Sequence, residues 1–159
     1  MSAARTLGTN VVIWIVMCAV IGWIAGLVPQ RCLAIDTFVT RSRSFERDAR
    51  VYHRLRIRRW KDRLPESNSL GRGQRSSKRT LNGRSAVPGF VAETRRAEYV
   101  HWAILCSGPC FFVWSPNWVA RTMTLFGIAF NLPFISVQRF NRLRAVRSGS
   151  GPVTMDRRP

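Results

Sequence analysis

The residues best suited to chemistry lie in the stretch ETRRAEYVHW, Glu93 to Trp102, where acidic, basic and imidazole side chains precede an apolar run. His101 is one of only two histidines in the chain, and imidazole readily takes up and returns a proton near neutral pH. Glu98 lies three residues before it, close enough on a helix to orient the ring. The stretch therefore predicts a general base, His101, with Glu98 as its catalytic partner.

A second polar stretch, NLPFISVQRFNRLR from Asn131 to Arg144, closes another apolar run. Guanidinium groups bind phosphate through paired hydrogen bonds, and amide side chains donate hydrogen bonds to hydroxyl or oxyanion oxygens. The candidates for holding a phosphate-bearing ligand are Arg95, Arg96, Arg139 and Arg142. The candidates for contacting a sugar or an oxyanion are Asn131, Gln138 and Asn141.

The charge balance of the chain also indicates an anionic partner. The 159 residues include 26 lysines and arginines against 8 aspartates and glutamates, a formal net charge of +18. Such a charge is typical of proteins that bind nucleic acid, an anionic membrane surface or a phosphate-bearing ligand. The hydropathy pattern helps to choose among these classes.

The elements that position the polar stretches include one long apolar run near the N-terminus. Val11 to Val28 contains 18 residues without a charge, which span about 27 Å as a helix, close to the ~30 Å hydrocarbon core of a bilayer. Residues 1–30 are therefore predicted to form an N-terminal transmembrane helix, or uncleaved signal anchor. A cleaved signal peptide is the alternative, but the run exceeds the usual ~7–15 residues and no clear small-residue cleavage site precedes Pro29.

Two further apolar runs, Tyr99 to Trp114 and Thr122 to Val137, flank the turn-like sequence SPNW. Each run is interrupted by a proline, Pro109 in the first and Pro133 in the second, and proline kinks or breaks a helix. Residues 91–147 are therefore predicted to form a kinked or re-entrant C-terminal helical hairpin with catalytic function. A hairpin brings the two polar stretches to one membrane surface.

The basic regions complete the predicted layout. Residues 41–66 have apolar side chains near helical spacing among arginines, which indicates a basic amphipathic interfacial segment in contact with anionic membrane lipid. Residues 67–90 are rich in Gly, Ser and Arg, which predicts a flexible basic linker, and residues 148–159 are predicted to be a disordered tail. The 17 lysines and arginines from Arg41 to Arg96 place the basic loop and the C-terminus in the cytoplasm. The expected fold is a mainly α-helical integral membrane protein of the cell membrane.

Three motifs, in their order and spacing, resemble one family of small bacterial membrane proteins. They are RRWKDRLP (Arg58 to Pro65), ETRRAEYVHW (Glu93 to Trp102) and NLPFISVQRFNRLR (Asn131 to Arg144). Over about Phe45 to Arg144 the chain is similar to the glycosyl-4,4'-diaponeurosporenoate acyltransferase family. The motif positions add Trp60, Lys61 and Glu93 to the candidate substrate-binding residues.

The resemblance implies transfer of a fatty acyl group to a sugar hydroxyl of a glycosylated carotenoid, towards a staphyloxanthin-like pigment. The acyl donor would be acyl-CoA or a similar co-substrate, and no cofactor is expected. In such a reaction His101 would take the hydroxyl proton, while the candidate arginines would hold donor phosphate. No metal site is predicted, because Cys106 and Cys110 lack a second pair of ligands.

Other interpretations remain open at the level of sequence. The acceptor is alternatively another membrane glycolipid, or the chain is a non-enzymatic basic membrane protein that binds anionic lipid or nucleic acid. Nucleic acid is the less favoured partner, because phosphate binding gives no role to acidic and amide side chains at the membrane boundary. Glu93 with Arg96, and Glu98 with Arg95, also have the spacing of simple helix-face ion pairs.

Overall fold

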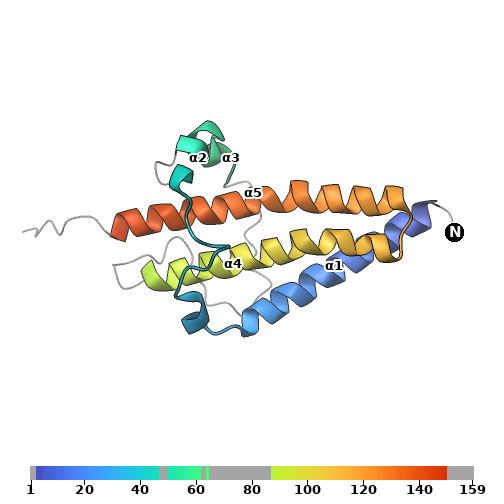
Figure 1. Ribbon diagram of the computed structural model, residues 1–159, viewed down its shortest axis with the longest axis horizontal. Helices are drawn as coiled ribbons and strands as arrows, with labels where there is room; N and C mark the ends of the chain where they lie inside the picture. Colours follow the sequence, from blue (N-terminus) through green and yellow to red (C-terminus); the bar gives the residue numbers. More distant parts are fainter. Residues whose placement is uncertain (1–2, 47–49, 62–63, 65–86, 150–159) are drawn as a thin grey trace, which may run out of the picture.

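The computed structural model describes residues 3–46, 50–61, 64 and 87–149, and within these ranges the chain is mostly helical with no β-strand (Figure 1). Three long helices form its body: α1 (Ala3–Leu27), α4 (Val87–Ser107) and α5 (Asn117–Gly149). The shorter elements are the 3-10 helices η1 (Gln30–Leu33), η2 (Ser44–Glu46) and η7 (Gly108–Val113), and the helices α2 (Arg50–Arg54) and α3 (Ile57–Trp60). The predicted mainly α-helical class is confirmed. The predicted linker up to residue 86 and the predicted tail from residue 150 lie outside the described residues.

The helices α4 and α5 lie side by side and antiparallel, joined by η7 (Figure 1). Helix α4 begins at Val87, within the predicted linker, rather than at residue 91. It ends at Ser107, because the next two residues are glycine and a proline that has no amide hydrogen for the α-helical ladder. The chain then turns through η7 into α5. This hairpin carries both polar stretches at the same end.

Helix α5 runs without interruption through Pro133, where the sequence predicted a kinked or re-entrant segment. Proline removes one amide hydrogen from the helix, but α5 is 33 residues long and packs against α4 along its length. Polar side chains also bond the helix backbone nearby, since Asn131 Nδ2 donates to Gly127 O at 2.8 Å and Ser136 Oγ donates to Leu132 O at 2.9 Å. One missing bond in so long a packed helix does not end it.

Helix α1 packs against the hairpin near the η7 end. Trp14 is buried and its indole stacks on Phe111, with ring centroids 6.1 Å apart. Gly127 of α5 permits this approach, because a Cβ there would lie 2.6 Å from the Trp14 ring. Asn10 is also buried, and its Oδ1 accepts a hydrogen bond from Trp114 Nε1 at 3.1 Å. Helix α1 is therefore part of the packed body rather than a detached segment.

The other end of α1 is fixed by Arg96 of α4. The guanidinium donates to the carbonyl oxygens of Ala25 and Val28, the latter at 2.7 Å. The last carbonyls of a helix lack hydrogen-bond partners within the helix and carry partial negative charge. The arginine supplies both the hydrogen-bond donors and a compensating positive charge.

The predicted amphipathic segment is not one continuous helix. Helix α2 ends at Arg54 and α3 begins at Ile57, and between them Arg56 has a φ of 49°, in the left-handed region. The apolar side chains of the two helices pack on α5, where the buried residues form one cluster: Tyr52, Ile57, Val137 and Phe140. Tyr52 is therefore buried against α5, and the contact of this segment with anionic membrane lipid stays a prediction.

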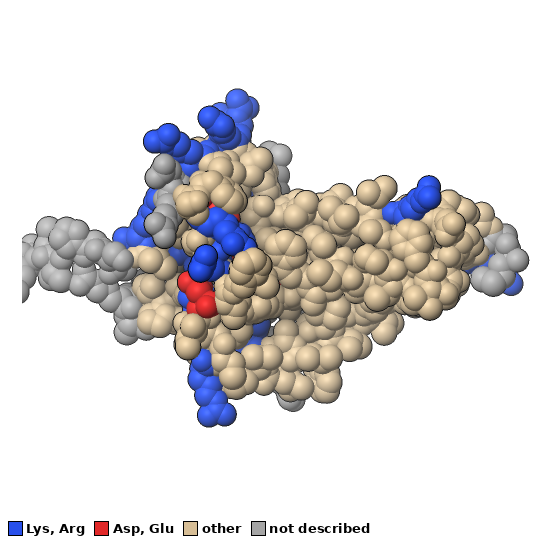
Figure 2. All heavy atoms as spheres, in the orientation of Figure 1, with Lys and Arg blue, Asp and Glu red and all other residues tan. Residues whose placement is uncertain are grey.

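The surface divides into a basic end and an apolar body. Lys and Arg side chains gather at the end of the molecule that carries α2 and α3, whereas most of the remaining visible surface has no charge (Figure 2). Exposed large apolar residues on the long helices include Val12, Ile15, Trp23, Leu125 and Phe130. Two helices, Ala3–Leu27 and the Asn117–Arg147 part of α5, are long and apolar enough to cross a bilayer.

Candidate active site

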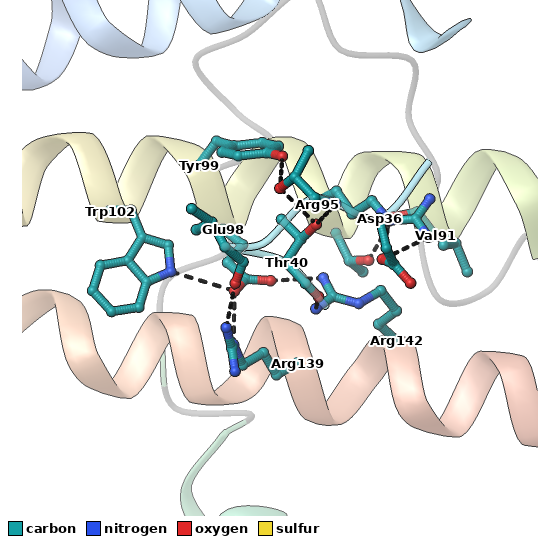
Figure 3. Close-up of polar contacts among 12 residues, drawn as sticks. Asp36, Thr40, Val91, Arg95, Glu98, Tyr99, Trp102, Arg139 and Arg142 are labelled. Atoms are coloured by element: carbon teal, nitrogen blue, oxygen red, sulfur yellow. Dashed lines mark hydrogen bonds and ion pairs between the residues drawn. The ribbon is translucent and has the colours of Figure 1, made fainter. Parts of the chain in front are cut away.

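A buried carboxylate, Glu98, lies where α4 faces the C-terminal half of α5 (Figure 3). Its Oε1 accepts hydrogen bonds from Arg139 Nε at 2.7 Å and from Trp102 Nε1 at 3.3 Å. Its Oε2 forms an ion pair with Arg142 Nη1 at 2.7 Å. Both oxygens of Glu98 are thus occupied by cations, and we call Glu98, Trp102, Arg139 and Arg142 the Glu98 cluster.

The two arginines of the Glu98 cluster also hold the segment that follows α1. Arg139 Nη1 pairs with Glu46 at 2.8 Å, and Arg139 Nη2 donates to the Val39 carbonyl at 2.5 Å. Arg142 Nη2 donates to the Thr40 carbonyl at 2.6 Å. Each guanidinium therefore bridges α4 and the segment before α2, which closes the segment over this end of the hairpin.

Glu46 is the second buried acid in this region. Burial alone would raise the pKa of its carboxyl, but three hydrogen bonds to the charged form outweigh burial. They come from the Arg43 backbone N–H at 2.7 Å, from Arg139 Nη1 at 2.8 Å and from the Tyr52 hydroxyl at 2.9 Å. The pKa of Glu46 therefore lies below its ordinary value. Burial and the neighbouring Glu46 carboxylate raise the pKa of Tyr52, so its hydroxyl remains a donor.

His101 and Asn131 form a neutral pair between α4 and α5. His101 Nδ1 lies 2.9 Å from Asn131 Oδ1, while Asn131 Nδ2 donates to the Gly127 carbonyl at 2.8 Å. This second bond assigns the amide, so Oδ1 faces the ring and accepts, and Nδ1 must carry the hydrogen. In the neutral ring Nε2 then carries the lone pair, and no side chain or backbone group among the described residues bonds it. The ring also stacks on Phe134, with centroids 4.6 Å apart.

The prediction that Glu98 orients His101 is wrong. The two residues lie on the same helix, but Glu98 bonds to Arg139, Arg142 and Trp102, and Asn131 is the residue that contacts the imidazole. The amide that the sequence nominated for substrate binding is thus the partner of the candidate base.

The four arginines predicted to hold phosphate all have partners within the protein. Beyond the two in the Glu98 cluster, Arg95 pairs with Asp36 at 2.8 Å and donates to the Leu33 carbonyl, also at 2.8 Å. Arg96 pairs with Glu93 at 3.1 Å, in addition to its bonds to α1. The helix-face pair of Glu93 and Arg96 is therefore formed, whereas the alternative pairing of Glu98 with Arg95 is not.

The remaining predicted binding residues lie outside the Glu98 cluster and the His101–Asn131 pair. Gln138 and Asn141 are partly exposed, and their side chains make no hydrogen bond to any other described residue. Trp60 packs against the buried cluster of α2, α3 and α5, and its Nε1 donates to the Leu55 carbonyl at 2.9 Å. Lys61 caps α3, with its backbone N–H directed to the Ile57 carbonyl.

Sequence reasoning missed two of the acids that complete these contacts, Asp36 and Glu46, which both precede α2. The described acidic residues all pair with arginines of α4 or α5, and they are Asp36, Glu46, Glu93 and Glu98. A signal was present in the composition, because 8 acids among 26 basic residues give each acid an excess of possible partners. An acid in the basic region after α1 was therefore a candidate partner for a buried arginine.

Comparison with known proteins identifies the kind of chemistry. Residues 36–149, more than half of the chain, match the family described as glycosyl-4,4'-diaponeurosporenoate acyltransferase. The chain belongs to this family. As a member of this acyltransferase family the protein is an acyl-transfer enzyme, which decides against the non-enzymatic alternative. The matched range contains the Glu98 cluster and the His101–Asn131 pair.

Individual relatives are distant but cover most of the chain. Proteins named glycosyl-4,4'-diaponeurosporenoate acyltransferase from Staphylococcus aureus strains bovine RF122 / ET3-1 and MRSA252 are 23% identical over 133 residues. The protein of that name from strain USA300 is 22% identical over the same length. Each alignment covers 82% of this chain and 80% of the relative. No solved structure matches the chain.

Proposed function

We propose that the protein is a membrane-bound enzyme that esterifies a sugar hydroxyl of a glycosylated carotenoid with a fatty acyl group. The names of the family and of the relatives support this acceptor class. The observation that carries the chemistry is the His101–Asn131 pair, because it leaves one ring nitrogen as a proton acceptor. The donor is an activated fatty acid such as a coenzyme A thioester.

In this mechanism His101 Nε2 takes the proton of the acceptor hydroxyl while the hydroxyl oxygen attacks the acyl carbonyl carbon. The imidazolium keeps its Nδ1–H bond to Asn131, which stabilises the charge as it forms. The tetrahedral intermediate then collapses, the bond from the carbonyl carbon to the leaving group breaks, and His101 returns the proton to that group. For a thioester donor the products are the ester and the free thiol.

The Glu98 cluster has a positioning role in this proposal. Both oxygens of Glu98 are occupied by arginines, so the carboxylate has no free site for a substrate proton. Its contacts to Arg139 and Arg142 instead fix α4 against α5, and this fixes His101 against Asn131.

Membrane attachment rests on α1 and α5. Both have the length and hydropathy of a spanning helix. Lys and Arg side chains gather at the end of the molecule that carries α2 and α3, which supports a cytoplasmic position for that end. The contacts of Asn10, Trp14 and Arg96 support a retained α1 rather than a cleaved signal peptide, because each ties α1 to the hairpin.

The test compares membranes that contain or lack the protein, with a saturating fatty acyl-CoA and a glycosylated carotenoid, and measures the acyl ester by mass spectrometry. His101→Gln should lower turnover ~10²–10⁴-fold, because glutamine forms hydrogen bonds but does not shuttle a proton. Ser136→Ala is the matched control on α5, since Ser136 is partly exposed and its hydroxyl bonds to the Leu132 carbonyl within its own helix. A His101→Gln enzyme that keeps more than about a third of the turnover would refute the base assignment.

A further inference from the structure

A cavity outside the hairpin site lies between α2, α3 and α5, with a volume of about 260 Å³. Its base is apolar and buried, and consists of Tyr52, Ile57 and Phe140. The rest of the lining is exposed and basic, and consists of His53, Arg56, Arg58 and Arg59. A cavity with an aromatic floor and several guanidinium groups around its opening is suited to bind an anion.

The cations of this cavity are not neutralised by the described part of the chain. Every described acidic residue pairs with an arginine of α4 or α5, and none of these acids pairs with Arg56, Arg58 or Arg59. Figure 2 shows Lys and Arg side chains gathered over this end of the molecule. Like charges around one cavity repel, and an anion between them removes that cost.

The backbone at the cavity is also strained. Arg56 has a φ of 49°, a left-handed conformation that is uncommon for residues other than glycine. This turn separates α2 from α3 and lets both helices contribute to the lining. Strain of this kind tends to occur at functional sites, which supports a ligand rather than a merely solvated surface.

We propose that this cavity, lined by Arg56, Arg58 and Arg59, binds the phosphate group of an amphiphile, either the acyl donor or an anionic phospholipid. Guanidinium groups form paired, charge-assisted hydrogen bonds with phosphate oxygens. The cavity is smaller than the ~300–1,000 Å³ pockets that enclose a whole drug-sized ligand. It therefore holds a headgroup while the apolar chain lies outside.

The cavity is connected to the hairpin site. Tyr52 forms part of its base and donates a hydrogen bond to Glu46, which pairs with Arg139. Along α5, Phe140 follows Asn131 by nine residues, which corresponds to roughly 13 Å at ~1.5 Å per residue. A donor held here by its phosphate needs an arm of about this length to bring its acyl carbonyl to His101. A coenzyme A thioester has a long arm between diphosphate and carbonyl, and this donor assignment rests on the proposed function.

The experiment measures binding rather than turnover, with the full-length protein in phosphatidylcholine nanodiscs. One arm uses radiolabelled pyrophosphate and coenzyme A, and the other uses a fluorescent phosphatidylglycerol in the disc. The cavity variant is Arg58→Gln with Arg59→Gln. Its matched control is Arg31→Gln with Arg54→Gln, which removes the same charge from exposed positions outside the cavity. The cavity variant should bind at least about tenfold more weakly, the loss expected for a charge-assisted hydrogen bond, and the control should bind like wild type.

Each outcome decides the proposal. Selective loss of pyrophosphate and coenzyme A binding supports the cavity and assigns it to the donor, whereas selective loss of phosphatidylglycerol binding supports it and assigns it to lipid. Equal losses in both double variants indicate bulk charge and overturn it, as does a wild-type protein that binds neither probe. His101→Gln should bind both probes normally, so a failure of the acyl-transfer proposal remains distinguishable from a failure of the cavity.

Discussion

The two polar contacts between α4 and α5 lie close together along α4 but differ in what they leave unoccupied. In the Glu98 cluster both carboxylate oxygens face arginines, and each arginine also bonds a backbone carbonyl of the preceding segment. In the His101–Asn131 pair one ring nitrogen has no partner among the described residues. The charged side chains from Glu93 to Trp102 therefore mainly hold the helices and the preceding segment together. The group available for chemistry is the neutral imidazole of His101. Loss of the first contact should act on stability, and loss of the second on turnover.

The largest expected effect on stability is that of Glu98→Gln. The change leaves Arg139 and Arg142 largely buried without their shared carboxylate, and breaking a buried ion pair in this way costs about 3–5 kcal/mol. We expect a low protein level in membranes and a clearly lower unfolding temperature in detergent. Glu93→Gln is the control, because its pair with Arg96 is more exposed and worth about 1 kcal/mol or less. A Glu98→Gln protein that unfolds like wild type but is inactive would show that Glu98 has a catalytic rather than a structural role.

The next effect is that of Asn131→Ala on turnover. The hydrogen bond to the ring becomes a bond to a cation when His101 is protonated, and such bonds are worth about 1.5–3 kcal/mol, or roughly 10–100-fold in rate. Because Asn131 acts through His101, the double variant with His101→Gln should be no slower than His101→Gln alone. Initial rates of ester formation at matched protein level measure both. Additive losses in the double variant would mean that Asn131 has a role independent of the ring.

A smaller effect concerns pH and the segment that Glu46 holds. The pKa of Glu46 is lower in the folded protein than in the unfolded chain, so its charged form stabilises the fold at every pH above the unfolded value, about 4.3. That stabilisation is lost as the pH falls through the lower, folded value. The difference in unfolding temperature between wild type and Glu46→Gln in detergent should be constant from pH 7 to about pH 5 and shrink in more acidic solution. A difference that persists unchanged to pH 3 would show that the charge of Glu46 is not what holds the segment.

The sequence was sufficient for the long helices and for the convergence of the two polar stretches. Apolar runs of the right length predict helices directly, and a short turn between them leaves an antiparallel pair as the simple arrangement. The candidate base and Asn131 were both named from the sequence, and both lie at one contact.

The local pair of Glu93 and Arg96 could be predicted from helical spacing, but the pairing of side chains distant in sequence could not. Arg139 and Glu46 are 93 residues apart, and Arg95 and Asp36 are 59 apart, so no local periodicity relates them. Glu98 and His101 have suitable helical spacing for a mutual contact, but Glu98 pairs with Arg142 of α5 and His101 bonds to Asn131 of α5. The turn at Arg56 and the continuity of α5 through Pro133 are cases where tertiary packing overrides local preference.

The smallest predicted effect concerns a region outside both the Glu98 cluster and the His101–Asn131 pair, where α1 meets the η7 end of the hairpin. Asn10→Ala removes the oxygen that accepts from Trp114 Nε1 at 3.1 Å and from Ser115 Oγ at 2.8 Å. A hydrogen bond within a protein contributes about 0.5–1.5 kcal/mol net, so the unfolding temperature in detergent should fall slightly while turnover stays at the wild-type level. Thr9→Ala is the matched control, because Thr9 is exposed and its hydroxyl bonds only to Arg5 O within α1. If α1 were removed as a signal peptide, Asn10→Ala and Thr9→Ala would unfold at the same temperature as wild type and the mature mass would lack the helix.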